Sequence, residues 1–163
     1  MPSIVEIPAN LMVPEHRHAF KPASPSWDHV VVSGEVDLDN SSAEAVALQG
    51  HSDDDTSFYE VHLKVGPWWR DVQTCVPQVS IDGYLNHDAD EDDQQSWIIR
   101  NLKWTTDGEG APNVGEVRIR LEFEVGLRGE ATWLRGLGYG FTAAGRRLGV
   151  GGVGQPGPIK TGP

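Results

Sequence analysis

The sequence predicts an all-β fold, an antiparallel β-sandwich of about six to seven strands. Apolar and polar residues alternate along "SFYEVHLKV" (57–65) and "EVRIRLEFEV" (116–125). This period of two is typical of antiparallel strands with one buried face and one wet face. Turn-forming clusters such as "HSDDD" and "TTDGEGAPN" separate the short apolar segments, and no segment keeps a helical period over three turns. This spacing indicates a sandwich or a barrel.

The chain divides into three parts by composition. Residues 1–26 contain five prolines, which disfavour helices and central strands. We expect these residues, here called the arm, to be extended and to lie on a surface or on a neighbouring subunit. Residues 27–145 form the expected sandwich domain, and residues 146–163, rich in glycine and proline, form an expected flexible tail.

Seven segments of the domain are expected to be strands. In chain order they are 29–37, 45–48, 57–65, 77–85, 96–104, 116–125 and 131–143. The alternation predicts core-facing side chains in two of them, namely Tyr59, Val61, Leu63, Val65, Val117, Ile119, Leu121, Phe123 and Val125. His62 alternates with them and is expected at the surface. The glycines of "GLGYGF" (136–141) lie inside a strand, so they indicate close packing or a bulge rather than a nucleotide loop.

Charge excludes some classes of partner. The formal net charge is −11 for 163 residues, and such a surface repels nucleic acid and anionic membranes. No apolar run approaches the roughly 20 residues that span a bilayer. The N-terminal sequence lacks a basic start followed by an apolar core, so we expect no signal peptide. The sequence does not indicate the cellular compartment.

An acidic loop offers a candidate metal site. Asp88, Asp90 and Asp92 alternate as in the opening of a calcium loop, where carboxylate oxygens converge on a hard cation. The glycine and closing glutamate positions of that motif hold Asp93 and Ile99 instead. The loop therefore either binds calcium or is a solvated connection.

Other groups of reactive residues are sparse. The six histidines show no zinc spacing, although the symmetry of an oligomer could gather one histidine from each chain. The single cysteine, Cys75, has no neighbouring base in the sequence and reads as a small buried hydrophobe. No catalytic arrangement stands out, so we expect a protein that is not an enzyme.

Six tryptophans exceed what a sandwich core of this size uses. The adjacent Trp68 and Trp69 should point to opposite faces of an extended segment, which leaves one of them exposed or at an interface. An exposed indole suits the C–H face of a sugar ring or a protein partner, and both readings stay open.

The order of these segments resembles the H-type lectins, the family of snail agglutinin and of the discoidin C-terminal domain. The likeness runs from "VVVSGEVDL" (30–38) through "HSDDDTSFYEVHLKVGPWW" (51–69) and "VPQVSIDGYLNHDADEDDQQSWIIRNLKWTTDG" (76–108) to "WLRGLGYGFTAAG" (133–145). It covers about residues 29–145. The order of elements carries the likeness more than any single motif.

The resemblance implies a homotrimer with a shallow sugar site at the subunit boundary, for galactose or N-acetylgalactosamine. It places the carboxylate that accepts sugar hydroxyls at Asp54 or Asp55, and an aromatic at Trp133. The family's arginine falls near Ser96, next to Trp97. No arginine stands there, and the nearest in the strand is Arg100, which leaves open a relative that has lost sugar binding.

A carbohydrate-binding module is therefore the leading expectation. One alternative is a structural subunit of a larger assembly, of the virion, phage tail or fibre type, whose arm clasps its neighbours. Another is a small β-barrel enzyme of the cyclase type with an apolar cavity lined by tryptophans. A shallow open site would favour the lectin, and a closed apolar cavity would favour the enzyme.

Overall fold

The structure is a computed structural model that describes residues 1–20, 27–38, 48–86, 96–130 and 132–147. Eight strands and one short helix are present in this part of the chain. In order they are β1 (Ser3–Glu6), the 3₁₀ helix η1 (Ala9–Leu11), β2 (His16–Phe20), β3 (Asp28–Asp37), β4 (Ser57–Trp69), β5 (Asp71–Asn86), β6 (Ser96–Asp107), β7 (Val117–Arg128) and β8 (Thr132–Arg146). No helix among the described residues has the length and apolar character that crossing a bilayer requires.

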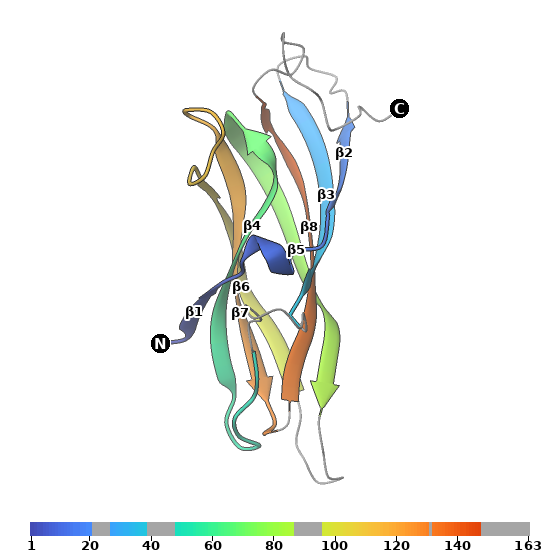
Figure 1. Cartoon of the computed structure of the whole chain (residues 1–163), viewed down its shortest axis with the longest axis vertical. Coiled ribbons are helices and arrows are strands. Elements are labelled where there is room, and N and C mark those ends of the chain that lie inside the picture. Colours follow the sequence, from blue (N-terminus) through green and yellow to red (C-terminus); the bar gives the residue numbers. More distant parts are fainter. Residues whose placement is uncertain (21–26, 39–47, 87–95, 131, 148–163) are drawn as a thin grey trace.

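The strands form two four-stranded sheets that pack face to face (Figure 1). The strand order is β1-β4-β7-β6 in sheet A and β2-β3-β8-β5 in sheet B. All pairs are antiparallel except β1 with β4. The predicted all-β sandwich is confirmed. The strand number is higher than six to seven because the arm contributes β1 and β2.

The core lies between the inner faces of the two sheets. On β4 and β7, Val61 pairs with Phe123 and Leu63 with Leu121, and all four side chains are buried. Side chains that stand directly opposite in a sheet share a face, so the register turns both predicted apolar faces inward together. Sheet B supplies the opposing layer, which includes Val30, Val32, Leu137 and Phe141.

The described part of the arm, residues 1–20, pairs with its own chain. Strand β1 lies along β4 in sheet A, η1 crosses the open side of the sandwich, and β2 lies along β3 in sheet B (Figure 1). Leu11 of η1 is buried in the core. Both strands are edge strands, the place where proline-rich segments are tolerated.

The end of β4 has an irregular register. Gly66 has a φ of +78°, and the pairing with β7 shifts between Val65 and Trp69. Trp69 is fully buried, whereas Trp68 is partly exposed. The two indoles therefore differ in exposure as predicted. In the predicted strand 45–48 only Leu48 belongs to the described residues, and it is buried.

Candidate functional site

The loop "HSDDD" (51–55) is attached to the turn between β7 and β8. Gly129 N donates to the Ser52 carbonyl at 2.8 Å, and Glu130 N donates to Asp53 Oδ1 at 3.1 Å. The Arg128 guanidinium donates to the Asp53 carbonyl. Each bond joins the loop to residues about 75 positions away in the sequence, so the turn fixes where the loop stands.

The two carboxylates expected to bind sugar lie on this fixed loop. The hydroxyl of Ser52 accepts hydrogen bonds from Asp54 N at 3.0 Å and from Asp55 N at 3.2 Å. Serine commonly organises turns in this way. Both aspartates are exposed. Their backbone is held while their carboxylates face solvent, as a shallow binding site requires.

Trp133 stands beside the segment that leads into this loop. Gln49 and Trp133 form an antiparallel bridge, and residues paired in this way project their side chains to the same face. Hydrogen bonds from Gly50 N to the Thr132 carbonyl and from Leu134 N to the Leu48 carbonyl flank the bridge. The indole of Trp133 is 43% exposed, and is therefore not a core side chain.

Three polar residues in this region, Gln49 and two residues that contact it, were not predicted as part of a site. Gln49 Nε2 lies 3.3 Å from His51 Nδ1. The Tyr59 hydroxyl donates to the Gln49 carbonyl at 2.7 Å and lies 3.2 Å from His51 Nε2. The alternation of β4 had assigned Tyr59 to the core. Its ring does pack against the core, while its hydroxyl reaches this cluster. We call Gln49, His51, Asp54, Asp55 and Trp133 the indole site.

Ser96 and Trp97 belong to the other sheet. They begin β6, where Ser96 pairs with Arg128 and Trp97 with Leu127 of β7. Trp97 is 50% exposed. Arg128 also anchors the "HSDDD" loop, so an arginine does stand beside Ser96, from the neighbouring strand. The register of two strands that are distant in sequence creates this proximity.

The prediction that His62 lies at the surface is wrong, because its side chain is buried. It points away from the core as predicted but is only 6% exposed. Its Nδ1 lies 2.7 Å from Glu6 Oε1 of β1, and its Nε2 lies 2.9 Å from Glu60 Oε1. Burial lowers the pKa of His62, but the hydrogen bonds to Glu60 and Glu6 outweigh it, and the pKa is raised above its ordinary value.

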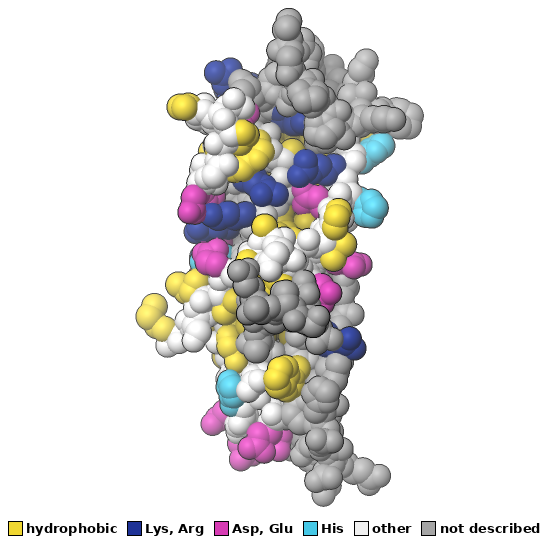
Figure 2. Space-filling view, viewed as in Figure 1, with side chains coloured by type: hydrophobic (Ala, Val, Ile, Leu, Met, Phe, Trp, Pro, Cys, Tyr) yellow, Lys and Arg dark blue, Asp and Glu magenta, His cyan; other side chains and the backbone are white. Residues whose placement is uncertain are grey.

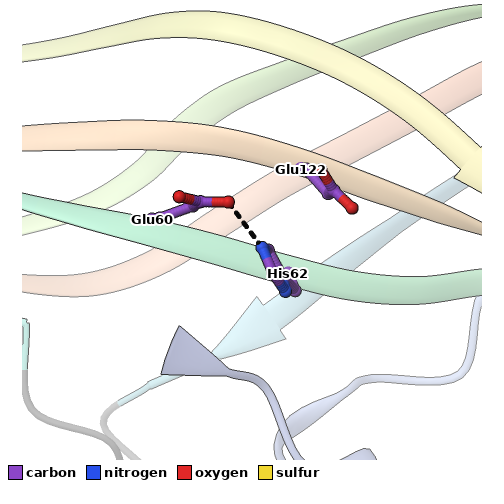
Figure 3. A group of neighbouring side chains, drawn as sticks. All are labelled: Glu60, His62 and Glu122. Carbon is purple, nitrogen blue, oxygen red and sulfur yellow. Dashed lines mark hydrogen bonds and ion pairs between the residues drawn. The ribbon is translucent and has the colours of Figure 1, made fainter. Parts of the chain in front are cut away.

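His62 also belongs to a group with metal-ligating side chains. Figure 3 shows Glu60 and His62 on β4 facing Glu122 on β7, and their ligand atoms lie within 4.8 Å of one another. Glu122 is already paired with Arg120 at 2.6 Å and with Lys103 at 3.0 Å. A divalent cation would have to displace these cations and the protons of the imidazole. The arrangement therefore fits a compensated charge network better than a metal centre.

The other predicted groups have simple outcomes. Asp88, Asp90 and Asp92 lie outside the described residues. Burial raises the pKa of the Cys75 thiol to about 12, which removes it as a nucleophile near neutral pH. No protein-family model, curated protein or solved structure matches this chain. The resemblance to H-type lectins stays a prediction from the sequence.

Proposed function

We propose that this chain is a carbohydrate-binding, lectin-like module and that the indole site binds the sugar. The observation that carries the proposal is the half-exposed indole of Trp133 on the same face as Gln49, at the end of the sandwich where "HSDDD" is fixed. An indole face offers an apolar platform for sugar C–H groups. The amide of Gln49, which pairs with Trp133, and the imidazole and carboxylates of the loop that follows it offer partners for hydroxyls.

The energies suit a weak, specific sugar site. A hydrogen bond to a charged acceptor contributes about 1.5–3 kcal/mol, and Asp54 and Asp55 supply such acceptors. Because Ser52 and Asp53 already hold the loop backbone, binding has little chain entropy to remove. The proposed ligand is a neutral sugar of the galactose or N-acetylgalactosamine type, which follows from the family resemblance.

The proposal includes a homotrimer. Trp97 and Ser96 lie on sheet A, whereas Trp133 lies on sheet B. In a site at a subunit boundary, Ser96 and Trp97 contribute from an adjoining subunit. Three linked sites would also multiply a weak single-site affinity. Light scattering of the full chain should report about three times the 17.8 kDa chain mass.

A glycan array followed by calorimetric titration of the best sugar tests the function. Trp133→Ala, Asp54→Ala and Asp55→Ala should each weaken binding at least tenfold and leave the melting temperature within a few degrees. Glu35→Ala, which removes an exposed carboxylate from β3, is the matched control and should bind as the wild type does. Unchanged binding in the Trp133 and aspartate variants would refute the site, and an empty array would refute the function.

A further inference from the structure

A polar cavity opens where the arm crosses from sheet A to sheet B. Its volume is about 730 Å³, and apolar residues of the arm line it together with four cations and three carboxylates. The cations are Arg17, Lys64, Arg118 and Arg120, and the carboxylates are Glu6, Glu15 and Glu109. On the face shown in Figure 2, Lys and Arg side chains gather in the upper half, with acidic side chains among them and beside them. This concentration is notable in a chain whose net charge is −11.

Three of the four cations have carboxylate partners. Arg17 pairs with Glu15 at 2.6 Å. Lys64 pairs with Glu109 at 2.6 Å. Arg120 pairs with Glu122 at the same distance. These pairs compensate the charge of each cation and leave Arg118 as the exception.

Arg118 has no carboxylate within 4.0 Å among the residues that the structure describes. Its Nε donates to the Gly66 carbonyl at 2.9 Å, and its guanidinium carbon lies 5.6 Å from the centre of the Trp68 ring. No acceptor within the described ranges takes a hydrogen bond from its two terminal nitrogens. One edge of the guanidinium is therefore fixed, and the other offers donors without a partner.

The same carbonyl brings a second positive charge close to Arg118. Arg17 Nη2 also donates to the Gly66 carbonyl, at 3.2 Å. Burial lowers the pKa of Arg118, the nearby carboxylate of Glu15 raises it, and the like charge of Arg17 lowers it. Glu15 is already paired with Arg17, so an anion at the unpaired edge of Arg118 would compensate the charge of this half-buried cation directly.

We propose that this cavity binds a small organic carboxylate, which the free edge of Arg118 holds in a bidentate pair. The planar guanidinium matches the two oxygens of a carboxylate. The cavity volume falls within the range of about 300–1,000 Å³ that ligand pockets occupy. Ile7, Pro8 and Met12 line it as well, and they would contact the organic part of the ligand.

The carboxylate site is separate from the indole site and does not depend on the proposed function. Arg118 is the second residue of β7, and Arg128, which anchors the "HSDDD" loop, is the last. The two sites therefore lie at opposite ends of β7. Two classes of ligand carry such a carboxylate, acidic sugars and aromatic acids, and the test separates them. D-Glucuronate and benzoate represent these two sources, with glucose and benzyl alcohol as neutral counterparts.

The test is a titration of the full-length protein with both acids at an ionic strength held constant with sodium chloride. We expect saturable binding of at least one acid and none of its neutral counterpart. Tighter binding of glucuronate would identify an acidic sugar as the ligand, and tighter binding of benzoate an aromatic acid. No saturable binding of either acid up to tens of millimolar would overturn the proposal.

Two variants locate the site. Arg118→Gln should raise the Kd at least tenfold. Arg146→Gln, which removes an exposed cation from β8, is the matched control and should change the Kd less than twofold. Equal affinity in both variants would overturn the proposal, because the anion would then bind elsewhere.

Tryptophan fluorescence of protein that keeps Arg118 locates the site even if Arg118→Gln does not fold. An anion at Arg118 should change the fluorescence of the neighbouring Trp68. Trp68→Phe keeps an aromatic ring under the guanidinium and should lose this change while still binding the acid. A change of undiminished size in Trp68→Phe would refute the location.

Discussion

Replacing Glu15 by glutamine tests how strongly the arm is attached to the sandwich. The Glu15 side chain is 9% exposed, and its two oxygens accept from three different residues. Oε2 accepts from the Tyr139 hydroxyl at 2.7 Å and from Gly66 N at 3.1 Å. Oε1 accepts from Arg17 Nε at 2.7 Å. One side chain of the arm thereby joins β2, β4 and β8.

Glu15→Gln keeps the shape and removes one acceptor. With its amide oxygen toward Arg17, the new NH₂ group faces the Tyr139 hydroxyl and the Gly66 N–H. The hydroxyl is free to rotate and accept, but the Gly66 N–H is left facing another donor. The loss is one charge-assisted hydrogen bond of about 1.5–3 kcal/mol and the weakening of others. We expect the free energy of unfolding to fall by about 2–4 kcal/mol.

Urea denaturation followed by tryptophan fluorescence measures this loss. With an m value of about 2 kcal/mol/M, the midpoint should fall by about 1–2 M while m is unchanged. Glu35→Gln makes the same chemical change at an exposed position and should cost less than about 0.5 kcal/mol. A loss below about 1 kcal/mol for Glu15→Gln would mean that these bonds contribute little net stability.

Three further predictions concern the core, the Gly66 backbone and pH. Phe123→Ala should lower the free energy of unfolding by about 3–5 kcal/mol in the same urea assay, and a loss below 1 kcal/mol would contradict its burial. Gly66→Ala should cost about 2–4 kcal/mol, because φ is +78° and the new Cβ would lie 2.4 Å from Phe141. Gly110→Ala, at φ +76° with open space around it, should cost only about 1 kcal/mol. Since the folded-state pKa of His62 is raised, its contribution should be full below about pH 6.5 and vanish as pH rises through the folded value; an identical pH profile for His62→Gln would contradict this.

The strands β3 to β8 were predictable because each carries its own pattern, whereas β1 and β2 of the proline-rich arm were not predicted as strands. The alternation in β4 and β7 shows which side chains share a face, and burial of one face decides the rest. His62 shows the limit of this reasoning. Its direction was predicted correctly, but its burial depends on Glu6, which lies 56 residues away and reaches it only because β1 pairs with β4. No local pattern specifies that pairing.

The indole site was predictable only in part for the same reason. Asp54, Asp55 and Trp133 came from a family resemblance. Gln49, His51 and Tyr59 carry no recognisable motif. They meet because residue 49 bridges residue 133 and Tyr59 reaches back over ten residues. The orientation of Arg118 likewise depends on its hydrogen bond to the Gly66 carbonyl of β4. The alternating charges of β7 do not predict that bond.

The position of the arm constrains how copies of this chain could be joined. Leu11 is buried in the core, and withdrawing it would cost about 1.5–3 kcal/mol. Withdrawal would also break the bonds of Glu15 to Tyr139 and Gly66. An arm that clasped an unrelated surface would have to offset both losses. An arm exchanged for the identical arm of a second copy would recreate every one of these contacts, so exchange is the form of clasping that this structure makes least costly. Glu15→Gln distinguishes exchange between copies from attachment to an unrelated surface. The substitution weakens the attachment of an exchanged arm as much as that of an arm held by its own chain. It leaves an arm bound to another surface unaffected.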